Sequence, residues 1–289
     1  MRAKKSLGQH FLKSEKALTS IVQAGEVTER DVVLEIGPGT GTLTRKLLET
    51  GAKVIAVEKD DELFKLLEQE FEKEIKNGKL ELIHDDILNF QTSNLKTYKL
   101  IANIPYNITG AILKKFLDAD KQPEKMVLLM QKEVAERIVG SPRHGVSGKL
   151  KGSILSISVK TYGTPKYVET VKAGSFAPMP KVDSAIIAIE NISKKFFSSV
   201  QSRALDISEE DFFQMLRAGF KSKRKKLSSN LSVVFEKNKV LEAFKRLDLN
   251  DNLRAEDVDM STWQKLAQNL CLKSKPRFTP PWRGKERGK

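Results

Sequence analysis

The chain has 289 residues, of which 39% are hydrophobic and 30% are charged, and Cys271 is its single cysteine. This composition is typical of a soluble globular protein with one large core or two modest ones, and one cysteine excludes both an intrachain disulfide and a cysteine cluster that binds zinc. No apolar run reaches the roughly 20 residues that cross a bilayer, and MRAKKSLGQHF lacks the apolar stretch of a secretory signal, so we expect a cytoplasmic protein with no membrane segment.

The positive charge of the chain is concentrated in its last third. Lys and Arg total 51 against 37 Asp and Glu, a net charge of +14, and residues 191–289 contribute 22 basic and 12 acidic residues, or +10. Such an excess attracts polyanions through counterion release, and nucleic acid is the polyanion that we expect. A moderate positive charge that serves only solubility is the alternative.

Buried strands and helices alternate from Asp31 onward. The apolar patterns predict strands at 32–36, 53–57, 80–83, 99–102, 126–130 and 184–190, and helices at 42–51, 61–75 and 110–117. Because such alternation builds a parallel sheet covered on both faces, we expect a Rossmann-like α/β fold.

The remainder of the chain has a helical pattern. Apolar residues recur at helical spacing between about Ile207 and Leu272, namely Phe213, Leu216, Phe220, Leu227 and Leu231. We therefore expect an α/β domain over 1–192 that carries the chemistry, a smaller all-α domain over 205–272, and a basic tail over 273–289. The tail has three prolines and almost no aliphatic residues, so we expect it to be disordered unless bound.

Polar residues follow four of the predicted strands. Gly37, Gly39 and Gly41 follow the first, Glu58 ends the second, Asp85 and Asp86 follow the third, and Asn103 follows the fourth. Ligands of open α/β sheets bind beyond the carboxyl ends of the strands, so these residues mark the expected site.

The glycines and Glu58 together predict a nucleoside site. Glu58 lies 21 residues after Gly37, where a carboxylate can accept both ribose hydroxyls. Thr42 stands where a dinucleotide fingerprint has glycine or alanine, and no phosphate-binding GK[ST] motif is present, so S-adenosylmethionine fits better than NAD or another phosphate ligand. Asp86, or alternatively Asp85, would bind the adenine amine; turn glycines with a surface glutamate are the structural alternative.

The segment NIPY at 103–106 has the residues needed to methylate an aromatic amine. The Asn103 side-chain carbonyl and the Ile104 backbone carbonyl can accept the two amine hydrogens, and Pro105 restricts Ile104 to extended geometry. Tyr106 offers a ring on which an unpaired base stacks, worth roughly 1–3 kcal/mol, and Phe176 can cover its other face. The alternative for NIPY is an ordinary turn, and the alternative for Phe176 is a core phenylalanine.

Seven motifs in this order resemble the KsgA-type small-subunit ribosomal RNA adenine dimethyltransferases. They are KKSLGQHFL, EIGPGTGTLT, VEKD, NIPYNIT, QKEVAERI, FAPMPKVDSA and FKSKRKKLSSNL, and the resemblance runs from about Lys4 to Leu270. It implies S-adenosylmethionine as the cofactor, with no metal, and two methyl groups added to N6 of each of two adjacent adenines in the 3′-terminal hairpin loop of 16S rRNA.

The resemblance also implies a cofactor set and a partner. The family's cofactor contacts fall on His10, Leu12, Gly37, Glu58, Asp86 and Asn103. The expected partner is 16S rRNA within an immature small ribosomal subunit, and the protein is expected to act as a monomer.

A basic run is predicted to lie on a helix whose other face is apolar. It comprises Arg217, Lys221, Lys223, Arg224, Lys225 and Lys226. We expect these residues to contact RNA phosphates, with a solvated helix face as the alternative.

Two other functions are compatible with most of these motifs. One is a macrolide-resistance methyltransferase that modifies 23S rRNA, and the other is a non-catalytic RNA-binding assembly factor. FAPMPKVDSA and FKSKRKKL favour the small-subunit enzyme over the first, and NIPY with Glu58 argues against the second because binding alone would not need them.

Overall fold

The computed structural model describes residues 9–140, 152–197 and 208–271. Its centre is a seven-stranded sheet in the order β4-β3-β2-β5-β6-β9-β7. The strands are β2 (Val32–Ile36), β3 (Lys53–Glu58), β4 (Leu80–His84), β5 (Lys99–Asn103), β6 (Lys125–Gln131), β7 (Thr164–Val171) and β9 (Ser184–Glu190). The predicted Rossmann-like fold is confirmed.

The sheet is mixed, whereas a parallel sheet was expected. The strands from β4 to β6 are parallel, but β9 runs antiparallel to both β6 and β7. The sequence pattern did not predict β7, since this edge strand contains Pro165 and alternates exposed with half-buried residues in place of an apolar run.

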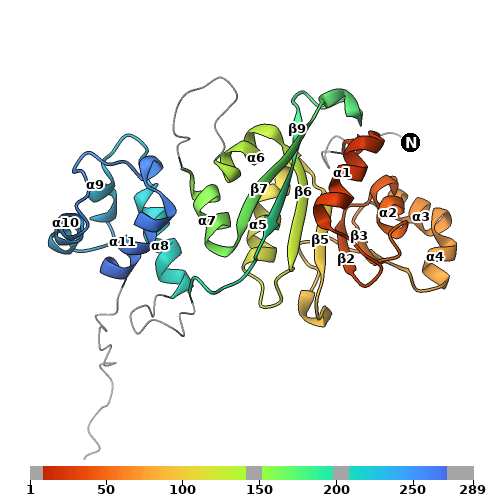
Figure 1. Ribbon diagram of the computed structural model, residues 1–289, viewed down its shortest axis with the longest axis horizontal. Coiled ribbons are helices and arrows are strands. Elements are labelled where there is room, and N and C mark those ends of the chain that lie inside the picture. The colour runs from red at the N-terminus through yellow and green to blue at the C-terminus, as the bar shows by residue number, and fades with distance from the viewer. Residues whose placement is uncertain (1–8, 141–151, 198–207, 272–289) are drawn as a thin grey trace, which may run out of the picture.

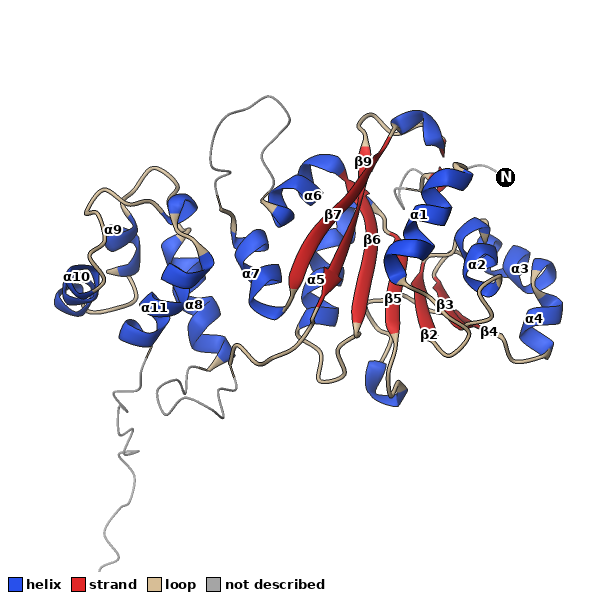
Figure 2. Ribbon diagram, viewed as in Figure 1, coloured by secondary structure: helices blue, strands red, loops and turns tan. Residues whose placement is uncertain are grey.

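Helices cover both faces of the sheet, as Figures 1 and 2 show. They are α1 (Glu15–Gly25), α2 (Thr42–Leu48), α3 (Asp61–Glu70), α4 (Glu72–Lys76), α5 (Thr109–Leu117), α6 (Lys132–Val139) and α7 (Ile154–Tyr162). Successive strand residues point to opposite faces, so Val33 packs in the core with α1 and α2 while Leu34 packs in the core with α5, α6 and α7. The helix expected over 61–75 is two helices that meet at the buried Phe71.

The helical part has its own core. It consists of α8 (Glu209–Gly219), α9 (Leu227–Leu231), α10 (Lys237–Arg246) and α11 (Met260–Leu270), packed around the fully buried Trp263. Ile157 of α7 also belongs to this core and so links it to the α/β part. The division into domains over 1–192 and 205–272 stays a prediction, and the tail expected over 273–289 lies outside the described residues.

The basic run was predicted on a helix, and this prediction was wrong for Lys221–Lys226. Because α8 ends at Gly219 and α9 begins at Leu227, these residues form the connection between the two helices. The buried Asn230 amide donates to the carbonyls of Gly219 and Ser222, at 2.7 and 3.0 Å. In a continuous helix those carbonyls would accept backbone N–H groups four residues later, and the Asn230 side chain hydrogen-bonds them here, where the helix is interrupted.

None of the helices among the described residues combines the length and the apolar character needed to cross a membrane.

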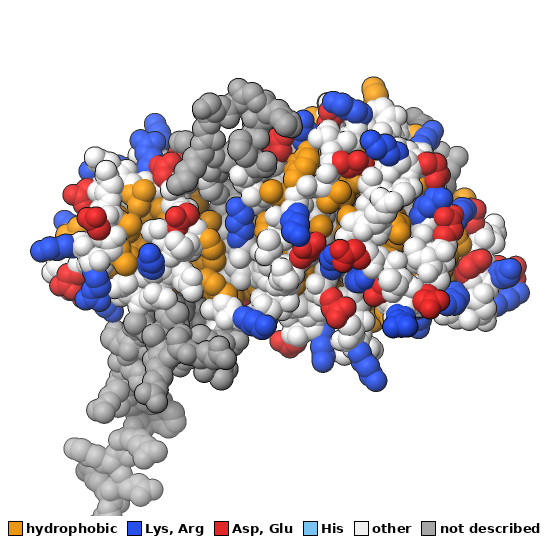
Figure 3. Space-filling view, in the orientation of Figure 1, with side chains coloured by type: hydrophobic (Ala, Val, Ile, Leu, Met, Phe, Trp, Pro, Cys, Tyr) orange, Lys and Arg blue, Asp and Glu red, His pale blue; other side chains and the backbone are white. Residues whose placement is uncertain are grey.

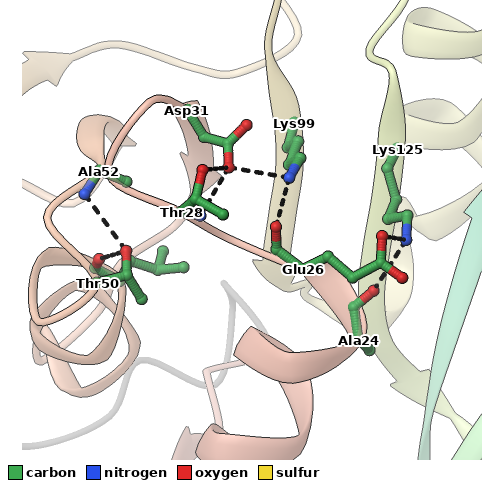
Figure 4. A network of polar contacts seen from close by, with 9 residues as sticks. Ala24, Glu26, Thr28, Asp31, Thr50, Ala52, Lys99 and Lys125 are labelled. Carbon is green, nitrogen blue, oxygen red and sulfur yellow. Dashed lines mark hydrogen bonds and ion pairs between the residues drawn. The ribbon is translucent and has the colours of Figure 1, made fainter.

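A polar network lies at the amino ends of the strands, drawn in Figure 4. Lys99, the first residue of β5, donates to Asp31 Oδ2 at 2.9 Å and to the Glu26 carbonyl at 2.7 Å. Lys125, the first residue of β6, pairs with Glu26 Oε2 at 2.8 Å. Both lysine side chains are nearly buried, so the network fixes the turn between α1 and β2 against the start of the two strands.

Candidate active site

A cavity opens at the carboxyl ends of four neighbouring strands, β4, β3, β2 and β5. Its volume is about 1180 Å³, including the open mouth. It is lined by the loop after β2, the end of β3, the turn after β4, the NIPY segment after β5 and the arm at residues 9–12.

Gly37 and Gly39 line the cavity, whereas Gly41 is not part of its lining, and the backbone of this loop would be strained by other residues. Gly39 and Gly41 have φ values of +62° and +75°. A Cβ atom on Gly41 would lie 2.5 Å from the Phe71 ring, and one on Gly39 would lie 3.0 Å from Phe11. Glycine at these positions therefore lets α2 begin directly against the cavity.

Glu58 presents a fixed carboxylate to the cavity. Its Oε2 accepts the Gly39 N–H at 3.1 Å and its Oε1 accepts the Asp60 N–H at 2.8 Å. Burial raises the pKa of this carboxyl group, and the backbone hydrogen bonds counteract that rise. Each oxygen retains a lone pair, so two vicinal ribose hydroxyls could donate to it.

Asp85 and Asp86 also line the cavity, with different surroundings. Asp86 Oδ1 accepts the Leu88 N–H at 2.9 Å, and Oδ2 pairs with Lys59 Nζ at 2.7 Å, which holds the pKa of Asp86 below its usual range. Asp85 Oδ1 accepts the Asp86 N–H, as a turn residue does. The sequence analysis did not single out Lys59, although its place directly after Glu58 could have indicated it.

Asn103 is oriented by the N-terminal arm. Its Nδ2 donates to the His10 carbonyl at 3.0 Å. Because the amide donor is held on that side, the side-chain oxygen faces the other way, and no hydrogen bond to this oxygen occurs among the described residues. Ile104 follows with a buried side chain, and Pro105 has φ −57° and ψ 132°.

Tyr106 is packed against the same arm. Its ring lies 5.7 Å from the His10 ring, at an interplanar angle of 24°, and its hydroxyl bonds Ser184 Oγ at 2.7 Å. The His10 Nδ1–H donates to the Pro178 carbonyl at 2.8 Å. One face of the Tyr106 ring, expected to accept a base, is therefore covered by an imidazole in this structure.

Phe176, which we expected to cover the second face of the base, is not among the residues that line the cavity. It pairs with Leu12 where the short strands β1 (Phe11–Leu12) and β8 (Phe176–Ala177) meet. This pairing directs the Phe176 ring into the core beside α1, where it is 5% exposed. The structure thus corresponds to the alternative interpretation, a core phenylalanine.

The basic residues lie on the helical part, away from the cavity lining. Arg217 on α8 and the basic side chains at 221–226 are exposed. Figure 3 shows lysine and arginine side chains spread over this part of the molecule, interspersed with acidic ones.

The fold and the cavity define the class of protein. The sheet with a reversed β9, and a cavity beyond the ends of its parallel strands that Gly37, Gly39 and Glu58 line, form the architecture of Rossmann-like S-adenosylmethionine-dependent methyltransferases. The chain belongs to the ribosomal RNA adenine dimethylase family, whose model matches residues 1–271.

Relatives and solved structures agree with this assignment. The chain is 39% identical to ribosomal RNA small subunit methyltransferase A of Dehalococcoides mccartyi over 94% of its length and 88% of the relative's, and 38% identical to that of Nostoc punctiforme over 95% and 97%. It is similar to a dimethyladenosine transferase from Plasmodium falciparum (TM-score 0.71, 28% identity, 89% and 96% covered). It is also similar to the 23S rRNA methyltransferase ErmE (TM-score 0.70, 25% identity, 90% and 99% covered).

Proposed function

We propose that this protein uses S-adenosylmethionine to dimethylate the N6 amine of two adjacent adenosines in the 3′-terminal hairpin loop of 16S rRNA. Family membership and the relatives named small subunit methyltransferase A support the reaction and the RNA. The observation that carries the chemistry is the orientation of Asn103, whose amide donor is held by His10 so that its oxygen remains available at the cavity.

The residues of the cavity fit the cofactor. The Glu58 carboxylate would hold the ribose, and Asp86 the adenine amine, in part by exchanging its contact with Lys59. The glycine loop and the backbone of His10 and Leu12 would surround the amino-acid tail. When bound, the cofactor supplies an electrophilic methyl group on a cationic sulfur.

The NIPY segment would orient the target amine. The lone pair of an aromatic amine is drawn into the ring, which makes the amine a poor nucleophile. Asn103 Oδ1 and the Ile104 carbonyl would accept its two hydrogens and so favour a tetrahedral nitrogen whose lone pair faces the methyl group, while the proton leaves to solvent. Tyr106 would stack on the base. The base would use the face of the Tyr106 ring that His10 leaves uncovered, or it would displace His10 from the other face. Phe176 supports the wall from the core and takes no part in this stacking.

The exposed basic side chains at 217–226 would bind RNA phosphates. Such contacts position the RNA without selecting its sequence. The target adenine must leave its stack to enter the cavity, which is least costly in a loop. We further propose that the substrate is 16S rRNA within an immature small subunit, and that the protein acts as a monomer in the cytoplasm.

A methyl-transfer assay tests the proposal. The protein is incubated with labelled S-adenosylmethionine and either immature small subunits or naked 23S rRNA, and the modified bases are mapped. We expect dimethyladenosine at two adjacent positions of the small-subunit RNA. Because of the similarity to ErmE, labelling of 23S rRNA alone is the outcome that would contradict the proposal.

The variant Asn103→Ala tests the amine geometry. We expect at least a hundredfold loss of methyl transfer, with the RNA affinity within a few-fold of wild type. Asn77→Ala removes an exposed amide beyond α4 and serves as the control. Unchanged methylation by Asn103→Ala would reject the proposed geometry.

A further inference from the structure

Two buried carboxyl groups on neighbouring strands line the cavity. Glu35 near the end of β2 and Glu58 at the end of β3 belong to paired strands, are 1% and 5% exposed, and both line the cavity. Both Glu58 oxygens accept backbone N–H groups. Glu35 Oε2, in contrast, has no hydrogen-bond partner among the described residues.

The surroundings of Glu35 disfavour its charge. Burial is the main cause that raises its pKa, to about 8, and the like charge of Glu58 adds to the rise. The Thr44 hydroxyl of α2 is close enough to oppose the rise, but the geometry of a full hydrogen bond is not reached, since Thr44 Oγ1 is itself without a partner in the described part of the chain. No basic side chain among the described residues acts on this carboxyl group.

An uncompensated acid in the wall of a cavity responds to the charge of whatever fills the cavity. The proposed cofactor carries a sulfonium, which becomes a neutral thioether once the methyl group has left, while the positive charge departs as the proton of the amine. In a cavity of low dielectric constant, a nearby cation favours the ionised carboxylate and its removal favours the acid.

We propose that Glu35 lets the cavity distinguish the cationic cofactor from the neutral product, because it releases its proton to solvent when the sulfonium enters and regains one after methyl transfer. This inference rests on the proposed function, since it assumes S-adenosylmethionine as the ligand. Its consequence is preferential retention of the cofactor before transfer and easier departure of the product afterwards.

Isothermal titration calorimetry in buffers of different ionisation enthalpy measures the protons released on binding. At pH 7 we expect S-adenosylmethionine to release up to about 0.9 proton more from the wild-type protein than from Glu35→Gln, and S-adenosylhomocysteine to show no such difference. The ratio of the two affinities should rise by up to about tenfold between pH 6 and pH 7 in the wild type and stay flat in Glu35→Gln. Glu81→Gln, which removes an exposed carboxylate outside the cavity, should behave like wild type.

A second ligand pair keeps the test decisive if Glu35→Gln does not fold. The dimethylsulfonium and methylthio derivatives of 5′-deoxyadenosine differ in the same charge and lack the titrating amino group. With the wild-type protein, the sulfonium should release a proton and the thioether should not. Equal proton release by both ligands, or a pH-dependent affinity ratio that survives in Glu35→Gln, would overturn the inference. In those cases cofactor binding itself persists, whereas absence of S-adenosylmethionine binding would refute the proposed function as well.

Discussion

Lys99→Met removes the lysine that joins β5 to the turn after α1. The Lys99 and Asp31 side chains are 13% and 17% exposed, so the substitution leaves a nearly buried carboxylate without its cation. Breaking a fully buried pair costs about 3–5 kcal/mol. Because Asp31 keeps the N–H and O–H of Thr28 at 2.7 and 2.9 Å, we expect a loss of about 2 kcal/mol of unfolding free energy, or about 4–8 °C in Tm.

The loss should depend on pH in one direction. Burial of Asp31 opposes its ionisation, but the hydrogen bonds from Lys99 and Thr28 outweigh it and lower the pKa below 3.8. A carboxyl group with a depressed pKa in the folded state stabilises fully above its unfolded pKa and loses that contribution as the pH falls through the folded value. The deficit of Lys99→Met should therefore be constant from pH 7 to about 5 and shrink below about 4.

Urea unfolding across this pH range is the assay, with Lys53→Met as the matched control. Lys53 and Glu81 are about half exposed and 3.3 Å apart, so their pair should contribute little. Methyl transfer at 25 °C should be unaffected, because Lys99 and Asn103 lie at opposite ends of β5. A deficit no larger than that of Lys53→Met, or one that does not shrink as the pH falls below 4, would refute the reasoning.

Three further predictions concern the cavity and the basic connection. Gly41→Ala should lower both the cofactor affinity and the unfolding free energy, the latter by about 1–3 kcal/mol. The reason is that the added Cβ would clash with Phe71 and that φ is positive at this position. Calorimetry that finds neither effect would contradict the close packing. Phe176→Ala should lose about 3 kcal/mol in urea unfolding as a core residue, whereas a purely stacking residue would lower kcat at unchanged stability. The double variant Lys223→Gln and Lys225→Gln should reduce the slope of log RNA affinity against log salt concentration by about 2, with cofactor binding unchanged. An unaltered slope would mean that these lysines are solvated and do not contact RNA.

The parts of the fold that local pattern determines could be predicted. The buried strands β2, β3, β5 and β6 are continuous apolar runs, and the carboxyl ends of parallel strands share one edge, so residues that are distant in the chain could be placed in one cavity. Their individual roles stay predictions.

The structure differs from the predictions at positions where contacts between distant parts of the chain determine the conformation. Helical spacing continues past Gly219, but α8 ends there. The Asn230 amide of α9 hydrogen-bonds the carbonyls of Gly219 and Ser222, a contact that the spacing does not reveal. The sequence motif around Phe176 suggested that its ring would face the base. The pairing of Phe176 with Leu12 instead directs the ring into the core. The covering of Tyr106 by His10 likewise depends on an arm that carries no periodic pattern.

The pairing of β1 with β8 has a consequence for how the protein is made. His10 and Pro178, which meet through a hydrogen bond at the cavity, are 168 residues apart in the chain. During synthesis the arm leaves the ribosome before the sheet, but its partner strand emerges only after most of the sheet has been translated. The nucleoside pocket is therefore among the last features to be completed, and a nascent chain that stops before Phe176 lacks the strand that holds the arm in place.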